Sequence, residues 1–107
     1  MDMKAISSDR NLLLEFSGEM DHHGARNALK EFERIVDASL PKNLVLDLNK
    51  VTFMDSSGIG VVMGRYKQMS YVGGTVYVYG IGKNVDRIFQ MSGLYKLVKQ
   101  WNQAEVK

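Results

Sequence analysis

Residues 53–60 read Phe-Met-Asp-Ser-Ser-Gly-Ile-Gly, and they connect two segments with different hydrophobic patterns. The preceding residues 44–48, Leu-Val-Leu-Asp-Leu, are nearly all apolar, which is typical of a central strand covered by helices. In the residues that follow, apolar side chains recur at offsets of three and four, which predicts a helix over about 57–69. Ser56 and Ser57 therefore lie where a strand turns into a helix.

The residues upstream predict a hairpin and an amphipathic helix. A strand over 11–17 can pair with residues 4–7, and Gly18-Glu19-Met20 ends it. Asp21 is a candidate N-cap of the next helix, and Pro41 stops that helix. One face of the helix is apolar: Ala25, Ala28, Leu29, Phe32, Ile35 and Val36. The opposite face is charged: Arg26, Lys30, Glu33, Arg34 and Asp37.

The residues downstream predict a strand, a short helix and a last short strand. Residues 75–79, Thr-Val-Tyr-Val-Tyr, are β-branched or aromatic, as residues in strands often are. A helix is expected over 83–91, and Gly93 suits the left-handed conformation that caps it. We expect Leu97–Val98 to form the last strand and residues 102–107 to form at most one turn of helix.

The order of these elements is β-β-α-β-α-β-α-β, which predicts an α/β domain with a mixed four- to five-stranded sheet and helices packed on it. The 107 residues suit a single domain, 1–107. Net charge is only +2 and the 14 basic residues are scattered, so we expect no nucleic-acid partner. No apolar run is long enough for a membrane span, and no signal peptide is visible, so we expect a cytoplasmic protein.

The chemistry that the two serines could support is restricted by their surroundings. A helix N-terminus favours anions, because its first N–H groups are free and the helix dipole is positive there. The hydrolase elbow needs a glycine two residues before the serine, but Met54 and Asp55 occupy those positions. No phosphate-binding or dinucleotide-binding glycine motif is present, and we expect no cofactor. Two roles remain for these serines: an ordinary helix cap, or the acceptor of a phosphate group.

Other chemical groups give little support for an enzyme or a metal site. Adjacent histidines project about 100° apart on a helix, so His22 and His23 would not converge on a metal as an i, i+4 pair does. Cysteine is absent, which excludes disulfides and thiolate ligands.

Three glycines lie in or at the start of the helix expected over about 57–69. We expect Gly58 and Gly60 to keep the backbone accessible, and Gly64 to allow close helix packing.

Four segments, in this order along the chain, carry a family resemblance: 18–23 (GEMDHH), 53–61 (FMDSSGIGV), 64–68 (GRYKQ) and 89–94 (FQMSGL). They resemble the anti-sigma factor antagonists of the STAS domain family, and most closely the sporulation members that antagonise anti-sigma F factors. The resemblance covers essentially the whole chain. It implies the STAS fold over 1–107 and a cytoplasmic regulator of transcription rather than an enzyme.

The resemblance also implies a phosphorylation switch. In that family the unphosphorylated antagonist binds an anti-sigma factor that is also a serine kinase, and this binding releases the sigma factor. Phosphorylation of the antagonist ends the binding, and a PP2C-type serine phosphatase restores it. By the match, Ser56 is the phosphorylated residue, and Asp21 lies on the kinase-facing surface. The residues expected to bind the partner are Asp21, Asp55, Ser56, Ser57, Gly58, Ile59 and Arg65.

Several alternatives stay open. Arg65 and Lys67, both expected to be exposed, could pair with acidic groups of the partner or form an ordinary solvated helix face. Periodicity favours a core position for Met63 and leaves Ile59 undecided between core and contact surface. The domain could instead be a STAS module that binds a nucleotide or another small anionic ligand at the helix N-terminus. It could also be an antagonist in a stress-response sigma pathway.

Overall fold

The computed structural model describes residues 1–101, apart from the side chains of Asn27 and Ala28. Two predictions lie outside this part: the place of the Ala28 side chain on the apolar helix face, and the turn of helix over 102–107. The observed elements are β1 (Asp2–Ser8), β2 (Asn11–Met20), α1 (His22–Ser39), β3 (Asn43–Met54), α2 (Ser56–Ser70), β4 (Thr75–Tyr79), α3 (Lys83–Ser92), the 3-10 helix η1 (Leu94–Lys96) and β5 (Lys99–Gln100). The predicted α/β class and the β-β-α-β-α-β-α-β order are confirmed.

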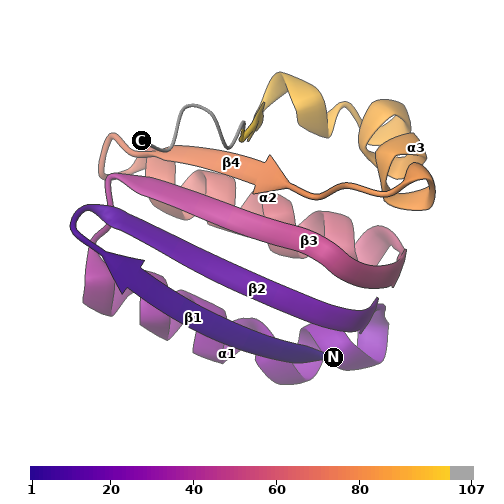
Figure 1. Ribbon diagram of the computed structural model, residues 1–107, viewed down its shortest axis with the longest axis horizontal. Helices are drawn as coiled ribbons and strands as arrows, with labels where there is room; N and C mark the ends of the chain where they lie inside the picture. Colours follow the sequence, from indigo (N-terminus) through magenta and orange to yellow (C-terminus); the bar gives the residue numbers. More distant parts are fainter. Residues whose placement is uncertain (102–107) are drawn as a thin grey trace.

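The five strands form one mixed sheet in the order β1-β2-β3-β4-β5 (Figure 1). β1 pairs with β2 antiparallel, through a two-residue turn at Asp9 and Arg10. β2, β3, β4 and β5 run parallel to one another. Because parallel neighbours require crossover connections, α1 links β2 to β3 and α2 links β3 to β4. The starts of α1 and α2 therefore meet at the same end of the sheet.

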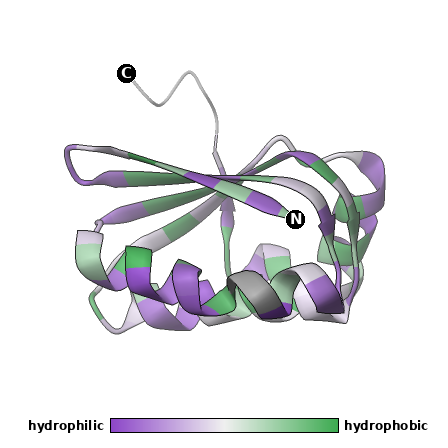
Figure 2. Cartoon of the chain, turned by 90° about the horizontal axis from the view of Figure 1, so that it is seen from below, coloured by the Kyte–Doolittle hydropathy of each residue, from purple (hydrophilic) through white to green (hydrophobic). Residues whose placement is uncertain are grey.

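Both crossover helices cover the same face of the sheet, so the molecule has a sheet layer and a helix layer (Figure 2). The core lies between the layers. Alternate side chains of β2 point into it, and Phe16 meets Phe32 of α1 edge to face, with ring centroids 5.0 Å apart. Burying a side chain of this size stabilises the fold by about 1.5–3 kcal/mol. The interior side chains of the three central strands are Leu12, Leu14, Phe16, Met20, Leu44, Leu46, Leu48, Met54, Val76 and Val78.

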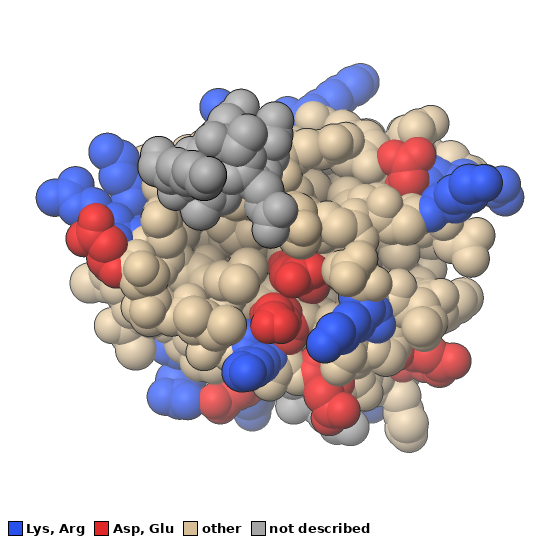
Figure 3. Space-filling view, viewed as in Figure 1, with Lys and Arg blue, Asp and Glu red and all other residues tan. Residues whose placement is uncertain are grey.

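Among residues 1–101, no helix packs on the opposite face of the sheet (Figure 2). Acidic and basic side chains lie next to one another on this face, with uncharged residues between them (Figure 3). No helix in the described part of the chain, residues 1–101, is long and apolar enough to cross a membrane.

Two strands are longer than predicted. β2 was expected to end before Gly18, but it continues to Met20 through two register shifts in its pairing with β3. Gly18 has φ +96°, a left-handed conformation that glycine adopts without strain, and this lets the strand bend and stay paired. β3 was expected over 44–48 but extends to Met54. Most of its added residues are exposed, so their sequence lacks the apolar run that marked the first part.

The end of the described chain also differs from the prediction. The last strand is Lys99–Gln100, not Leu97–Val98. Leu94 and Val98, four residues apart, are both buried in the core, so the chain turns through η1 before it pairs with β4. Gly93 has φ +78° and caps α3 in the left-handed conformation, as predicted.

The helix faces are confirmed in outline but not at every residue. α1 buries Ala25, Phe32 and Val36, whereas Leu29 is 36% exposed. In α2 the buried residues are Gly58, Val61, Val62, Arg65 and Met69. The predicted core position of Met63 is wrong, because this side chain is 37% exposed.

Candidate functional site

Two paired strands bring the predicted site residues together. Met20 at the end of β2 is the register partner of Met54 at the end of β3. The next residue on each strand is an aspartate, Asp21 or Asp55, and each aspartate caps the helix that follows. The carboxyl ends of parallel strands meet at one edge of the sheet, and ligand sites of open α/β sheets occur at such edges. Residues that lie 34 positions apart in the sequence thus become neighbours.

Asp55 accepts hydrogen bonds from the starts of both helices. Its Oδ1 accepts from the backbone N–H of Ser57 at 2.8 Å, which is the capping contact within α2. Its Oδ2 lies 3.3 Å from the backbone nitrogen of His22 at the start of α1. This carboxylate therefore fixes the two helix starts relative to each other. The sequence predicted neither this contact nor any other between Asp55 and α1.

Asp21 is the N-cap of α1, as predicted. Its Oδ1 accepts a hydrogen bond from the backbone N–H of Gly24 at 2.9 Å. This bond is the main reason that the pKa of the Asp21 carboxyl is lowered from its ordinary value of 3.8. Asp21 is therefore a carboxylate at neutral pH, so two carboxylates mark this end of the sheet.

Ser56 is the first residue of α2, and its side chain is exposed. None of the side-chain hydrogen bonds within residues 1–101 uses its hydroxyl. The helix is capped by the preceding Asp55, so the Ser56 hydroxyl is not needed as a cap. Ser57, in contrast, is half-buried, and its backbone N–H is the one that Asp55 caps. The more accessible hydroxyl is that of Ser56.

Gly58 is a packing residue. A methyl group at this position would collide with Cγ of the buried Met54 and would lie 2.8 Å from the backbone oxygen of Met20. The expectation that Gly58 keeps the backbone open to a partner is therefore wrong, because its surroundings are filled from inside the protein. Gly60 and Gly64 would meet no atom within 4 Å, so the predicted packing role of Gly64 is wrong as well. Ile59 is half-buried against the core.

Arg65 lies in the interface between α1 and α2, and the expectation that it is exposed is wrong. It is only 2% exposed, and its Nη2 lies 3.6 Å from a carboxylate oxygen of Glu33. Burial lowers the pKa of the Arg65 guanidinium, against the opposing effect of Glu33 and Asp37. Beside it, Gln68 donates to Asp37 at 2.7 Å. A charged residue on a helix face resembles a surface residue in the sequence, so no signal there predicted this position.

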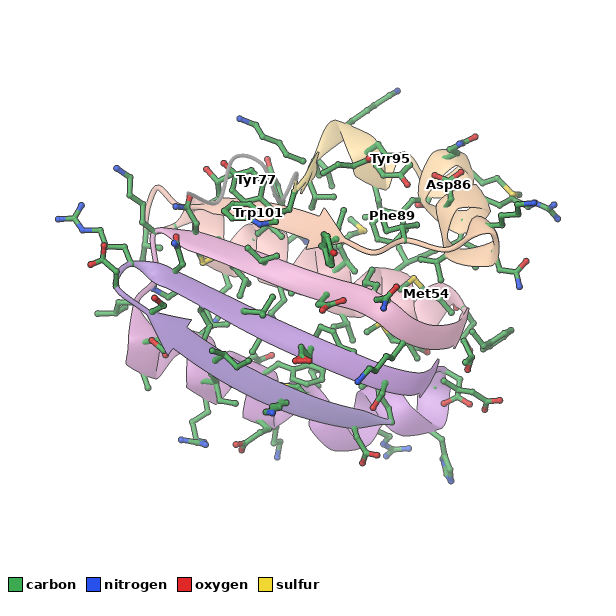
Figure 4. All side chains as sticks on the ribbon, in the orientation of Figure 1. Met54, Tyr77, Asp86, Phe89, Tyr95 and Trp101 are labelled. Atoms are coloured by element: carbon green, nitrogen blue, oxygen red, sulfur yellow. The ribbon has the colours of Figure 1, made fainter. Side chains whose placement is uncertain are left out.

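A second polar cluster, which the sequence analysis missed, lies beyond β4 (Figure 4). The Tyr95 hydroxyl of η1 donates to Oδ1 of Asp86 in α3, and Gln90 donates to Oδ2 of the same carboxylate at 2.8 Å. Burial is the main cause, and the Asp86 hydrogen bond the second, of a rise in the Tyr95 pKa to about 12. The Tyr95 ring also packs on Phe89 at 5.3 Å between centroids. This cluster fixes α3 to η1.

The histidines and other possible metal ligands of residues 1–101 lie apart from one another or from the serine hydroxyls. His22 and His23 are exposed in the first turn of α1. Within residues 1–101 neither histidine is hydrogen-bonded to a serine hydroxyl, so no nucleophile-and-base pair is formed there. No group of three metal-ligating side chains converges among the described residues. The site offers an accessible hydroxyl at a helix start, with two carboxylates nearby.

The STAS domain model matches residues 2–106, and the chain belongs to the STAS domain family. A curated relative, the anti-sigma F factor antagonist of Paenibacillus polymyxa, is 37% identical over 87 residues, which cover 81% of this chain and 74% of the relative.

More distant proteins are similar over nearly the whole chain. The anti-sigma-B factor antagonist of Staphylococcus aureus (strain NCTC 8325 / PS 47) is 22% identical over 110 residues, covering 100% of this chain and 98% of that protein. A solved structure, the Bacillus cell fate determinant SpoIIAA in the phosphorylated form, superimposes with a TM-score of 0.74 at 23% identity. The superposition covers 97% of this chain and 95% of the SpoIIAA chain. The predicted STAS fold is confirmed by these comparisons.

Proposed function

We propose that this protein is an anti-sigma factor antagonist whose binding is switched off by phosphorylation of Ser56. In its unphosphorylated form it binds an anti-sigma factor with serine kinase activity, and the sigma factor is released. The similarity to the Paenibacillus antagonist supports the antagonist function. The exposed Ser56 hydroxyl, which the helix does not need as a cap, is the observation that carries the switch.

The physical reason for the switch lies in the charge that a phosphate adds. A phosphoserine carries about −1.5 to −2 charges at neutral pH. The free N–H groups at the start of α2 tolerate this charge, so the fold need not change. A partner that covered Ser56 would instead bury the phosphate close to the carboxylate of Asp55. Burying an unpaired charge costs several kcal/mol, and each 1.4 kcal/mol weakens binding about tenfold.

We propose that the partner binds the surface around the starts of α1 and α2. Asp21, Asp55, Ser57 and Ile59 are all partly accessible there, next to the exposed Ser56. Gly58 and Arg65 are buried, so their part in binding would be to position the start of α2 and to join α2 to α1. The function proposed for the site is protein binding, not catalysis.

We assign the protein to a sporulation pathway, and we expect it to act in the cytoplasm with a PP2C-type serine phosphatase that removes the phosphate. The 37% identity to an anti-sigma F factor antagonist supports this assignment over a stress-response pathway, for which the anti-sigma-B relative is 22% identical. Binding to the two anti-sigma kinases, F-type and B-type, from the same organism separates these pathways. Tighter binding to the B-type protein would reverse the assignment.

Mass spectrometry after incubation with ATP and the anti-sigma kinase tests the switch. Wild type, Ser56→Ala and Ser57→Ala are compared, and we expect one added phosphate that only Ser56→Ala loses. Binding of the kinase to phosphorylated wild type should be at least a hundredfold weaker than to the unmodified protein. If an active kinase left the wild type unmodified, the switch would be excluded. Saturable binding of a nucleotide without any protein partner would then favour a ligand-binding STAS module.

A further inference from the structure

A row of apolar side chains crosses the face of the sheet that lies opposite α1 and α2. Ile6 of β1 is the register partner of Leu13 of β2, and Leu13 is the register partner of Val45 of β3. The next residues along these strands, Leu14 and Leu46, point into the core on the helix side, so the row points the other way. A cavity of about 370 Å³ is lined by all three members of this apolar row.

Two aromatic side chains border the cavity beside β4. Tyr77 continues the apolar row as the register partner of Val45, and the Trp101 ring packs against it edge to face at 4.6 Å between centroids (Figure 4). The backbone N–H of Trp101 donates to the carbonyl oxygen of Val78 at 2.7 Å, which fixes the chain at this point. Tyr79 and Trp101 both line the cavity.

The charge at the cavity is negative. Among the described residues that line it, Asp47 alone is charged. Asp47 is the register partner of Glu15, so two carboxylates lie on neighbouring strands, an arrangement that destabilises a sheet. Lys4 pairs in register with Glu15 on the side away from Asp47.

The Asp47 carboxylate has an unused oxygen. Its Oδ1 accepts a hydrogen bond from the backbone N–H of Asn49 at 2.9 Å, whereas no side-chain hydrogen bond within residues 1–101 uses Oδ2. Both ion pairs found in this part of the chain lie on α1 and α2, so neither Asp47 nor Glu15 is paired with a cation there. A positive group in the cavity would offset the repulsion between these two carboxylates.

We propose that this cavity binds a small organic cation. Its apolar body lies on the row of Ile6, Leu13 and Val45, and its ammonium group binds Asp47. Small-molecule sites commonly have volumes of about 300–1,000 Å³, with apolar and aromatic walls and a few polar groups. A cation within about 6 Å of an aromatic ring centre is attracted to the ring as well, so Tyr79 and Trp101 favour the same charge as Asp47.

The site is separate from the proposed phosphorylation site. Val45 precedes Met54, at the end of β3, by nine residues, which is roughly 30 Å along the strand. Binding in the cavity therefore does not depend on the phosphorylation of Ser56.

Nitrogen–proton correlation NMR tests the proposal. Trp101 is the only tryptophan of the chain, so its indole N–H gives a single signal that reports on the cavity. The probes are phenethylamine, the uncharged phenethyl alcohol and the anionic phenylacetate. For probes of this size we expect a dissociation constant of roughly 1–10 mM for the amine. Binding of the alcohol should be at least about fivefold weaker, and phenylacetate should leave the Trp101 signal unchanged.

Three variants assign the contacts. Asp47→Asn keeps the oxygen that accepts from Asn49 but removes the charge, so it should bind the amine about fivefold to tenfold more weakly and the alcohol as wild type does. Tyr79→Leu should weaken binding of the amine by about twofold to fivefold. Asp2→Asn is the matched control and should bind as wild type, because Asp2 is exposed on β1 and does not line the cavity.

Two results would overturn the proposal. If phenethylamine left the Trp101 signal in place at concentrations well above the millimolar range, the cavity would not be a binding site. If the amine and the alcohol bound equally well, and Asp47→Asn bound both as wild type does, the site would not select a cation. Failure of a kinase to modify Ser56 would refute the proposed function instead, and would leave these measurements unaffected.

Discussion

Adding one methyl group to Gly58 should destabilise the protein, although alanine is normally the better residue in a helix. The new Cβ would lie 2.8 Å from the backbone oxygen of Met20 and would collide with the side chain of Met54, which is 1% exposed. Neither neighbour can move freely, because one is backbone and the other is packed in the core. Overpacking of this kind costs about 1–3 kcal/mol.

The helix itself opposes this cost. Replacing an interior glycine by alanine stabilises a helix by about 0.5–1 kcal/mol. For Gly58→Ala we therefore expect a net loss of about 1–2 kcal/mol. In a domain of this size that loss lowers the melting temperature by roughly 5–10 °C.

Gly60→Ala is the matched control, because it makes the same chemical change two residues further along the same helix. A Cβ at Gly60 would meet no atom within 4 Å, so only the helix preference remains. We expect this variant to be about 0.5–1 kcal/mol more stable than the wild type. Urea unfolding followed by circular dichroism measures both variants. A Gly58→Ala protein as stable as the wild type, or equal losses in the two variants, would refute the packing argument.

The remaining predictions concern Arg65 and Tyr95. Replacing the buried Arg65 by methionine should leave the unfolding free energy within about 1 kcal/mol of wild type or raise it, since Glu33 stays largely hydrated. Arg65→Ala should lose about 2 kcal/mol or more through the cavity that it leaves, and unchanged partner binding by Arg65→Met would confirm a purely interhelical role. The Tyr95 pKa is raised to about 12, so the stability that Tyr95 contributes is complete below pH 10 and is lost as the pH rises through 12. The difference in absorbance at 295 nm between wild type and Tyr95→Phe should show this midpoint, and a midpoint near 10 would contradict the cluster with Asp86.

Features that depend on a few neighbouring residues were predicted correctly from the sequence. The strand over 75–79 and the capping residues Asp21 and Gly93 lie where they were expected. These features depend on backbone preferences and on neighbours a few residues away, which a sequence displays directly. The same reasoning failed where polar residues continue a strand: β3 extends to Met54 because β2 pairs with it there, not because of its own composition.

The candidate site was predicted as a set of residues but not as a geometry. The sequence identified Ser56 and the two aspartates, whereas the contact of Asp55 with α1 depends on the pairing of Met20 with Met54. The roles of Gly58, Gly64 and Arg65 were assigned incorrectly, because each depends on what a second element places beside it. A glycine looks the same in a sequence whether it faces a packed methionine or open solvent.

The sequence by itself determined the α/β class, the order of the elements, and a serine at the junction of a strand and a helix. Those properties follow from local periodicity and from residues whose backbone preferences are strong. Only the tertiary structure decided which face of α2 is buried, and that Asp55 joins two helix starts. Contacts between α1 and α2 depend on how both helices are placed by the sheet, and no local pattern in either helix contains that information.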